Sequence, residues 1–416
     1  MGRAGASRIK GRAMHLNSTN HNAQTYLAER RAIILGSLKA ICGERGADLE
    51  QALPGGAALM DRVFDYASRG KMLRGSLVYL GAELFGRPEA RGLAEIAAAM
   101  EFFQAGLLIH DDIMDRDDRR RGGPSVHAAY IDEASASGAG DPRHLGESLA
   151  TCAGDVCFFE AIRLLSSVAG GSGAATTGSL TTGSAAIGRA VLGGPAGAAA
   201  ADGAKAADGA KAVSTGLASL IALCGSELSV VGLAQMTDCR FGELPAEPSE
   251  GEIIAMYRGK TARYSFSLPF ALGAALAGRD DSREAIFAIG DLSGLAFQLR
   301  DDEIGLYGDP ERTGKVAGSD IRENKKTLWR SRLLARAGAE QGPRLLSIYG
   351  NGDIGTVEVE YVRHLTAALG VRVEIAQWRD DMVAEAKVLI AALDVGDEGV
   401  RSILLDLVDW MASRKS

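Results

Sequence analysis

The sequence predicts an all-α protein, built as a single large helical bundle. Over most of the 416 residues, apolar side chains recur at spacings of three and four, which is the period of an amphipathic helix. Stretches with the alternating pattern of a β-strand are few, and none competes with the helical pattern. No Pro-rich linker divides the chain, and a large helical fold can fill this length as one unit.

The helical pattern starts near Ala23. Residues 1–22 are polar and basic without apolar periodicity, so we expect a disordered basic leader before one domain over residues 23–416. The helices that we expect, in order, cover residues 24–48, 57–68, 71–85, 91–113, 146–167, 217–241, 250–276, 283–306, 323–337, 356–367, 371–392 and 398–413.

One stretch breaks this pattern. Residues 168–215 consist almost entirely of Gly, Ala, Ser and Thr and contain the tandem repeat Ala-Asp-Gly-Ala-Lys-Ala at 201–212. Such a composition buries too little apolar surface to offset the entropy of ordering, so we predict a flexible insertion between two helices, with a functional lid as the minor alternative. The polar stretch 133–143 receives the same interpretation.

Composition excludes several classes of protein. Lys and Arg number 46 against 53 Asp and Glu, and the net charge of −7 argues against nucleic acid as the main partner. The five cysteines form no CxxC pair and show no zinc-ligand spacing, as expected of reduced thiols. No signal peptide and no uncharged apolar run of transmembrane length is recognisable, so we expect a cytoplasmic protein without a transmembrane segment.

The first candidate site is the acidic turn Asp111-Asp112-Ile-Met-Asp115. On a helix, Asp111 and Asp115 lie one turn apart on one face, where like charges repel by roughly 0.2 to 0.5 kcal/mol and raise each other's pKa. A divalent cation turns this repulsion into binding. Mg²⁺ prefers oxygen ligands and commonly takes one or two carboxylates together with substrate phosphates, so the turn predicts a site for Mg²⁺ and a diphosphate.

The second acidic pair, Asp301-Asp302, lies far downstream, and both acidic sites have basic residues nearby. Arg120 and Arg121 follow the first cluster, and arginine forks bind phosphate oxygens in a bidentate manner. Further basic residues occur in Gly70-Lys71-Met-Leu-Arg74, in Lys260-Thr261, and in the segments that contain Lys315 and Lys325.

A lone DDxxD turn is commonly just a solvated acidic turn, but here it belongs to an ordered set of motifs. In order, these are Gly-Lys-x-x-Arg, Glu101-x-x-Gln104, DDxxD, Arg-Arg-Gly, Gly154-Asp155, Lys-Thr, and Phe297-Gln298-x-x-Asp-Asp followed by Gly-Lys. From about Gly70 to Thr327 the set resembles the trans-isoprenyl diphosphate synthases of the polyprenyl synthetase family, of geranylgeranyl type.

The resemblance implies an isoprenoid-synthase-type bundle around a deep central cavity, with the two clusters facing each other across it. It also implies a homodimer and a head-to-tail condensation of isopentenyl diphosphate with an allylic diphosphate. Three Mg²⁺ ions would be bound with the substrate diphosphate. Asp111 and Asp115 would hold two of them and Asp301 would help to hold the third, with Asp112 and Asp302 in support.

The resemblance also divides the basic and amide residues between the two substrates. The allylic diphosphate would be surrounded by Arg120, Lys260, Gln298, Lys315 and Lys325, and Thr261 belongs to the same predicted site. The diphosphate of isopentenyl diphosphate would be gripped by Lys71, Arg74, Gln104 and Arg121, with Gln104 at a position where many relatives have histidine.

The chemistry accounts for these residue types. Breaking an allylic carbon–oxygen bond creates a carbocation and a highly charged diphosphate, so positive charge must be aimed at the leaving group. An apolar cavity shelters the cation from water until the alkene attacks, and the released diphosphate serves as the base for the final proton. The reaction requires no side-chain nucleophile.

The chain departs from the family pattern in the second cluster, where Gly305 stands at the position of a third aspartate. Glu303 is adjacent but points elsewhere on a helix. We therefore expect a water molecule to take the Mg²⁺ coordination position that a third aspartate would fill, and we expect activity to be retained. Gln235 and Asp238 have two readings of equal weight, as groups that orient a diphosphate or as hydrogen-bonded helix residues.

Two other polar groups are given ordinary roles. His110 has no partner at metal-ligand spacing and is expected to be a hydrogen-bonded support. Arg414 and Lys415 are expected to serve solubility rather than to approach isopentenyl diphosphate.

Side chains upstream of Asp111 should set the length of the product. Relatives that make farnesyl diphosphate often have an aromatic plug near the position of Gly106, and its absence suggests a longer product. Phe102 and Phe103 lie about a turn deeper as a candidate floor, although ordinary core packing is the usual role of such residues. We therefore expect geranylgeranyl diphosphate, then farnesyl diphosphate, then longer chains. The alternative functions are a class I terpene cyclase, whose second metal motif is not evident, and a non-catalytic synthase subunit, which should have eroded clusters.

Overall fold

The computed structural model describes residues 23–169, 203–308 and 318–414, and for residues 169 and 203–218 it describes the backbone alone. Within these ranges the fold is all-α, as predicted. The strands are β1 (Arg119–Arg120) and β2 (Gly123–Pro124), which form a two-residue antiparallel hairpin with Arg119 opposite Pro124. This hairpin carries the arginine pair that follows the first acidic cluster.

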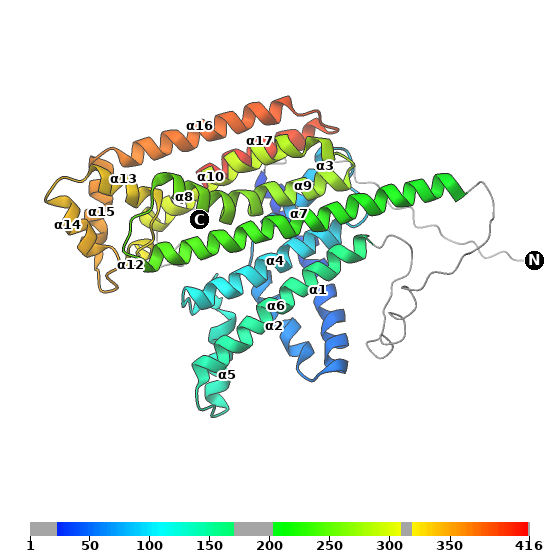
Figure 1. Ribbon diagram of the computed structural model, residues 1–416, viewed down its shortest axis with the longest axis horizontal. Helices are drawn as coiled ribbons and strands as arrows, with labels where there is room; N and C mark the ends of the chain where they lie inside the picture. Colours follow the sequence, from blue (N-terminus) through cyan, green and yellow to red (C-terminus); the bar gives the residue numbers. More distant parts are fainter. Residues whose placement is uncertain (1–22, 170–202, 309–317, 415–416) are drawn as a thin grey trace, which may run out of the picture.

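The helices run along the chain as follows (Figure 1): α1 Ala23–Ala52, α2 Gly56–Ser68, α3 Leu73–Leu84, α4 Leu93–Met114, α5 Val126–Ala136, α6 Pro142–Ala169, α7 Gly203–Glu243, α8 Glu250–Tyr257, the π-helix η2 Arg258–Ser267, α9 Leu268–Leu276, the 3₁₀ turn η3 Asp280–Ser282, α10 Arg283–Tyr307, α12 Ser319–Arg322, α13 Leu328–Arg336, α14 Gln341–Ile348, α15 Thr356–Ala368, α16 Val371–Ala392 and α17 Glu398–Ser413.

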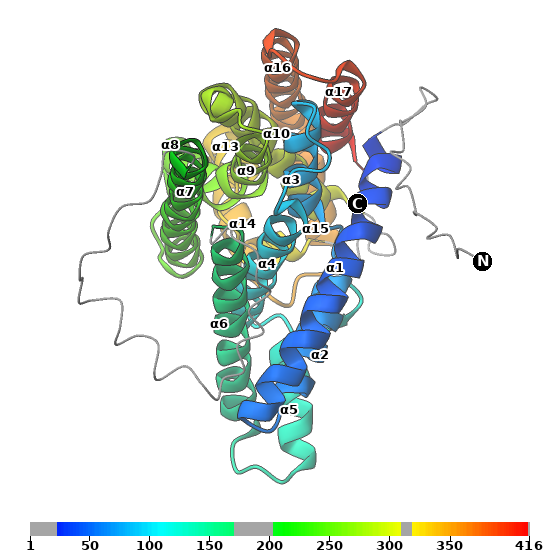
Figure 2. The ribbon, with the colours of Figure 1, turned by 90° about the vertical axis from the view of Figure 1, so that its right-hand side faces the viewer.

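The site-bearing helices lie in the middle of the bundle. α4 packs against α3 and α6, and α10 packs against η2, α16 and α17. In both ribbon views α2, α5 and α6 lie in the lower part of the molecule and α10, α16 and α17 in the upper part, and α1 runs from the upper part to the lower (Figures 1 and 2). Three buried apolar clusters fill the spaces between these helices, so the elements that carry the acidic residues are fixed on a packed core.

The main differences from the predicted helices lie at short or irregular elements. The predicted helix 250–276 is one helical run whose centre, η2, has π geometry, and π segments are common at functional sites. The predicted helix 323–337 is shorter than expected, since α13 spans Leu328–Arg336 and the residues between it and α12, which ends at Arg322, are not helical. Sequence periodicity missed α5 and α14 because each is too short to give a clear pattern.

Part of the predicted flexible insertion is helical. α7 begins at Gly203, so residues 203–215 continue the helix that we expected to start at 217. The repeat is rich in alanine, which has the highest intrinsic helix propensity, and this local preference overrides the lack of apolar periodicity. Residues 170–202 and the predicted leader 1–22 lie outside the described residues. Within the stretch 133–143, residues 133–136 belong to α5 and 142–143 to α6, and residues 137–141 form the connection between them.

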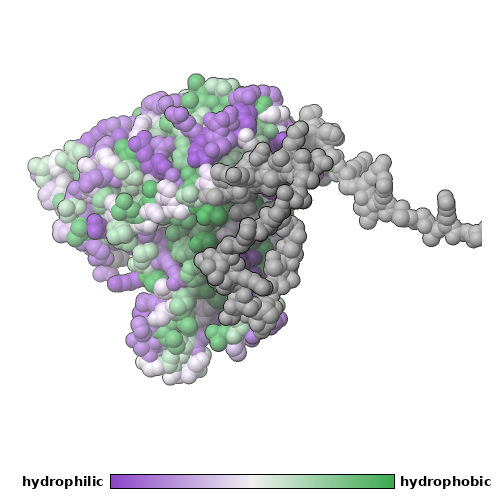
Figure 3. Space-filling view, turned by 45° about the vertical axis from the view of Figure 1, so that its right-hand side comes forward, coloured by the Kyte–Doolittle hydropathy of each residue, from purple (hydrophilic) through white to green (hydrophobic). Residues whose placement is uncertain are grey.

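Two described helices are long and apolar enough to cross a bilayer by length and composition alone: α4 and the Ser219–Glu243 part of α7. The α4 window is 72% buried, as in the core helix of a packed protein, so it is weak evidence for a membrane span. The α7 window is only 28% buried and exposes Leu233 and Met236. Figure 3 shows hydrophobic residues exposed in a band between the upper and lower parts of one face.

Candidate active site

The first acidic cluster lies at the C-terminal end of α4, and its aspartates have different surroundings. Asp112 is fully buried and accepts a hydrogen bond of 2.6 Å from the Tyr66 hydroxyl. It also accepts a 2.6 Å hydrogen bond from Nε of Arg120, which follows in β1. Asp112 is therefore a fixed support, whereas Asp111 and Asp115 stay available at the rim of the site.

The available carboxylates of Asp111 and Asp115 repel each other, although two lysines lie near them. Partial burial, and after it the charge of Asp111, raises the pKa of Asp115 to about 6, although Lys260 and Lys325 act in the opposite direction. The C-terminal end of a helix dipole is itself negative, which adds to the repulsion. Lys260 Nζ lies 3.6 Å from Asp111 Oδ1, so a cationic side chain already approaches this cluster.

The second acidic cluster repeats this division of roles on α10. Asp302 is buried and accepts hydrogen bonds from the Tyr257 hydroxyl and, at 2.8 Å, from Nε2 of Gln298. Burial, and after it the charge of Asp320, raises the pKa of Asp302 to about 8. Asp301 is 45% exposed and stays accessible. Both clusters thus have one aspartate fixed by a tyrosine and at least one that faces outwards.

Arg414 has a different role from the one predicted. Its guanidinium pairs with Asp301, lies 3.9 Å from the centre of the Phe297 ring, and is almost completely buried. Arg300 Nε donates a 2.7 Å hydrogen bond to the Arg414 carbonyl and fixes the end of α17 beside α10. The expectation that Arg414 serves solubility is therefore wrong, because the bundle brings the C-terminus to the second cluster. Lys415 lies outside the described residues.

These carboxylates fit a divalent metal that is bound together with a phosphate ligand. No group of three His, Cys, Asp or Glu side chains in the described part of the chain forms a metal site by itself. However, Lys260 lies near Asp111 and Arg414 pairs with Asp301, so each carboxylate already lies beside a positive charge, as it would beside a metal ion. A metal at either cluster would complete its coordination with substrate oxygens and water, which is the usual behaviour of Mg²⁺.

The residues predicted to grip isopentenyl diphosphate gather at one side of the site. Lys71 lies 5.8 Å from the centre of the Trp410 ring, and burial together with the charges of Arg414 and Arg121 lowers its pKa. Burial also lowers the pKa of Arg121, to which the charge of Arg74 contributes. Mutually repelling cations in a partly buried position favour a bound anion.

A cavity of about 620 Å³ lies beside these cations, lined by Lys71 and Arg414 together with Arg31, Arg69 and Trp410. Arg74 does not line this cavity: it borders the apolar cavity described below, stacks on Tyr264 at 4.7 Å and donates a hydrogen bond to Ser265. The cavity lined by Lys71 and Arg414 can accept a diphosphate group.

Several residues predicted around the allylic diphosphate contact one another or an acidic residue. Lys260 and Thr261 lie in η2 and line the apolar cavity that is described below, and the Thr261 hydroxyl donates a 2.7 Å hydrogen bond to Gln298. Lys260 Nζ also lies 2.6 Å from Asp238, which connects that residue to the site, and Lys325 Nζ lies 2.8 Å from Glu323.

Arg120 instead pairs with Asp112 and Asp117, and it does not line the apolar cavity described below. Lys315 lies outside the described residues.

Unusual backbone conformations coincide with these segments. Among the described residues, the non-glycine residues with positive φ are Met72, Arg116, Arg121 and Asn324. Each belongs to, or is adjacent to, a motif that carries a predicted site residue. Such conformations cost on the order of 1 to 3 kcal/mol and persist where the surrounding structure fixes them, which is common at functional sites.

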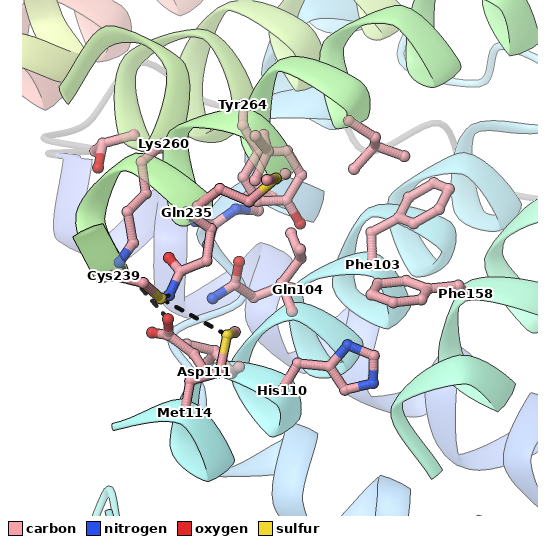
Figure 4. Close-up of a pocket in the computed structure, with 18 of the residues that line it drawn as sticks. Phe103, Gln104, His110, Asp111, Met114, Phe158, Gln235, Cys239, Lys260 and Tyr264 are labelled. Carbon is pink, nitrogen blue, oxygen red and sulfur yellow. Dashed lines mark hydrogen bonds and ion pairs between the residues drawn. The ribbon is translucent and has the colours of Figure 1, made fainter. Parts of the chain in front are cut away.

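An apolar cavity of about 740 Å³ extends from the first cluster into the bundle. Figure 4 shows Asp111, Lys260 and Cys239 at one end, Phe103 and Phe158 at the other, and Gln104 and Gln235 between them. The second cluster does not line this cavity directly, although Thr261 links the cavity to Gln298 and so to Asp302. The cavity has the polarity that a ligand with a charged head and an apolar tail requires.

Several residues of the site carried no recognisable signal in the sequence. Tyr66 and Tyr257 lie 46 and 45 positions from the aspartates that they fix, so no local motif connects them. Phe158 looked like one more apolar residue of a helix. His110 is the predicted hydrogen-bonded support, with Nε2 3.1 Å from the Thr151 carbonyl, and Gly154 leaves room for its ring, because a Cβ there would lie 2.3 Å from that nitrogen.

Comparison with known proteins gives consistent results. The Polyprenyl synthetase family model matches residues 57–366. A short chain isoprenyl diphosphate synthase of Methanothermobacter thermautotrophicus is 31% identical over 68% of this chain and 69% of its own. For a geranylgeranyl diphosphate synthase of Saccharolobus solfataricus the identity is 28%, over 71% and 72%. For a (2E,6E)-farnesyl diphosphate synthase of Mycobacterium tuberculosis it is 28%, over 83% and 80%.

Among solved structures, a geranylgeranyl pyrophosphate synthase from Corynebacterium glutamicum, complexed with isoprenyl diphosphate and magnesium, has a TM-score of 0.74 to this chain. It is 25% identical, and the match covers 94% of this chain and 99% of that one. A geranylgeranyl pyrophosphate synthetase from Pyrococcus horikoshii has the same fold, with a TM-score of 0.69, and covers 94% and 98% of the two chains.

Proposed function

The chain belongs to the polyprenyl synthetase family of prenyltransferases, and we propose that it joins isopentenyl diphosphate head to tail to an allylic diphosphate in a Mg²⁺-dependent reaction. The observation that carries this proposal is the 740 Å³ cavity, with Asp111 and Lys260 at its charged end and aromatic residues at its apolar end. A trans-prenyl diphosphate synthase needs this combination, because its substrates have a diphosphate head and a hydrocarbon tail.

In this proposal the two substrates bind on different groups of cations. The allylic diphosphate lies between Asp111, Asp115 and Asp301, with Lys260 and Lys325 beside it, while Arg120 fixes Asp112. Three bound Mg²⁺ ions would supply the positive charge that makes the diphosphate a leaving group. The proximity of Lys260 to Asp111 and the coupling of Lys325 to Asp115 support this arrangement.

The diphosphate of isopentenyl diphosphate binds to Lys71, Arg74 and Arg121. Their crowded positive charges support this assignment: burial, and after it the charges of Arg414 and Arg121, lower the pKa of Lys71, and a bound anion would relieve the repulsion. Gln104 lines the same cavity as Arg74 and Lys260 and can orient the head group of the reacting alkene. The apolar walls exclude water from the carbocation, and the released diphosphate accepts the final proton.

The product that we propose is geranylgeranyl diphosphate, with farnesyl diphosphate as the alternative and longer chains third. The position of the floor differs from our expectation. Phe102 is a core residue, whereas Phe103 lines the cavity and faces Phe158 of α6, with ring centres 6.5 Å apart. We therefore propose that Phe103 and Phe158 together limit the length of the product.

Gly106 is not part of this floor. It does not line the cavity, and a Cβ atom there would lie 2.7 Å from the Phe158 ring and 2.9 Å from the Gly154 carbonyl. Gly106→Tyr would consequently push α4 away from α6 instead of plugging the cavity. Phe158→Ala is the better test, because it removes the floor without filling a helix contact.

One experiment tests the function and the product together. Purified protein is incubated with Mg²⁺, labelled isopentenyl diphosphate and a series of allylic primers of increasing length, and the products are separated by chromatography. We expect extension of the primers to a twenty-carbon product, and longer products with Phe158→Ala. Failure of the folded wild-type protein to extend any primer would reject the synthase, and a cyclised hydrocarbon would identify a terpene cyclase.

We also propose a cytoplasmic homodimer. All five cysteines are free thiols, which supports a reducing compartment. α6 exposes Leu145, Leu149 and Phe159 at helical spacing on one face, and such an apolar stripe supports a partner of the same kind. Light scattering on the wild type and on Leu149→Glu tests this, since the variant should be monomeric; a monomeric wild type would contradict the proposal.

A further inference from the structure

The two acidic clusters differ at their fifth position. The first cluster has Asp115 four residues after Asp111, whereas the second has Gly305 four residues after Asp301. Glu303 does not replace the missing carboxylate, because it is buried and paired with Arg300 and Arg379 on another side of α10. Along α10 alone, the second cluster therefore lacks one acid.

A carboxylate from another element occupies the space beside Gly305. A Cβ atom built on Gly305 would lie 2.2 Å from Oδ2 of Asp320 and 2.8 Å from its Cγ. The Asp320 carboxylate thus lies against the α-carbon from which an aspartate at position 305 would extend. The two side chains cannot both take this position, so a glycine at 305 is what admits Asp320.

The local fold holds Asp320 in this position. Asp320 belongs to α12, which follows Gly318 with a φ of 74° and packs against α10. The backbone N–H of Lys325 donates a 2.9 Å hydrogen bond to the Asp320 carbonyl, and Lys325 Nζ lies 3.5 Å from Oδ1. The Asp320 side chain is 18% exposed, so it is neither sealed in the core nor fully in solvent.

We propose that Asp320 supplies the third carboxylate of the second cluster from outside α10. It is a positioning residue: it holds Lys325 toward the diphosphate and accepts hydrogen bonds from the water shell of a cation on Asp301. This inference rests on the proposed function, since it concerns the same diphosphate and the same cation. It replaces the expectation that only a water molecule takes the coordination position that an aspartate at 305 would fill.

The test measures binding instead of turnover. Calorimetric titration of Mg²⁺ into wild-type protein with inorganic diphosphate gives the Mg²⁺ concentration at half-saturation. We expect Asp320→Asn to raise this concentration by roughly 10- to 100-fold, the usual effect of removing a group that orients metal ligands. Glu323→Gln is the matched control, because Glu323 also pairs with Lys325 but is not beside Gly305, and it should leave the midpoint nearly unchanged.

A carboxylate swap gives the second measurement. In Gly305→Asp/Asp320→Ala the acid returns through position 305 and the atoms that would collide with it are removed, so the midpoint should recover most of the way to the wild-type value. Equal midpoints for Asp320→Asn and wild type would overturn the inference, as would an equal effect of Glu323→Gln. If Asp320→Asn alone fails to fold, the swap decides, since a wild-type midpoint supports the inference and a weakened one rejects it.

The outcome separates the inference from the proposed function. Absence of Mg²⁺-dependent diphosphate binding by the wild type would count against the proposed function itself. Normal binding by the wild type together with normal binding by Asp320→Asn would count against Asp320 alone.

Discussion

The two acidic clusters are built on the same plan but balance their charge differently. In each, the inner aspartate is buried and fixed by a tyrosine from a distant helix, Tyr66 for Asp112 and Tyr257 for Asp302. The first cluster adds Arg120, a neighbour in sequence. The second adds the neutral amide of Gln298 and takes its cation, Arg414, from the C-terminus.

This difference teaches that one cluster can take its carboxylates and its arginine from a single stretch of sequence, while its counterpart collects its groups from several elements. The carboxylates and the arginine of the first cluster lie within Asp111 to Arg120, and Tyr66 and Lys260 come from other helices. The second cluster draws on α8, α12 and the end of α17, which meet only after the bundle has packed. The first cluster should therefore be less sensitive than the second to changes elsewhere in the chain.

The largest effect should come from the outer aspartate of the first cluster. Asp111→Asn removes a carboxylate at the charged end of the cavity, and we expect primer extension to fall at least about 10² to 10³-fold, as for the loss of one major electrostatic group in an active site. Circular dichroism should be unchanged, because Asp111 is not a core residue. Retention of near wild-type turnover would remove Asp111 from the proposed mechanism.

The inner aspartates should differ in stability. Asp112→Asn leaves Arg120 without its buried partner and should destabilise the protein by about 3 kcal/mol, as when one partner of a buried ion pair is removed. Asp302→Asn should cost much less at neutral pH, because the raised pKa of Asp302 already favours the neutral acid and Gln298 and Tyr257 are uncharged partners. Urea unfolding at pH 7 compares the two, and equal losses would contradict the distinction.

The second cluster should also give a pH dependence that the asparagine variant lacks. The pKa of Asp302 rises from its usual 3.8 to about 8 in the folded protein. Over that interval the folded state keeps a proton that the unfolded chain has released. The contribution of Asp302 to stability is therefore fully present below pH 3.8 and is lost as the pH rises through about 8.

Urea midpoints measured from pH 5 to pH 8 test this contribution (a range inside the interval between the two pKa values). We expect the stability of the wild type to fall relative to that of Asp302→Asn as the pH rises. Parallel curves for the two proteins would show that Asp302 does not titrate in this way.

The smallest effect on Mg²⁺ binding should come from Arg414, the cation that the second cluster takes from the C-terminus. Arg414 competes with any metal at Asp301, and an ion pair whose carboxylate is 45% exposed contributes only about 0.2 to 1 kcal/mol. Arg414→Gln should therefore lower the Mg²⁺ concentration needed for diphosphate binding by roughly 1.5- to 5-fold. Calorimetry on the variant measures this shift, and a higher Mg²⁺ requirement would show that Arg414 assists the site.

The sequence revealed the parts of the fold and site that depend on local pattern. Helical periodicity located α16 within its observed bounds of Val371–Ala392, and the spacing of Asp111 and Asp115 indicated one helical face. Tyr66 and Tyr257 were not predictable, because a tyrosine that fixes an aspartate some 45 residues away carries no local signal. The role of Gly106 in setting product length was misjudged for the same reason, since its neighbour Phe158 lies on another helix.

The division of labour between the clusters is tested most directly by one Mg²⁺ titration of primer extension, with Asp111→Asn and Asp301→Asn measured side by side. Asp301 is the exposed member of an assembled cluster, so high Mg²⁺ should restore part of the activity of Asp301→Asn, whereas Asp111→Asn should stay inactive at every concentration. Equal recovery of the two variants, or recovery of Asp111→Asn alone, would contradict the account.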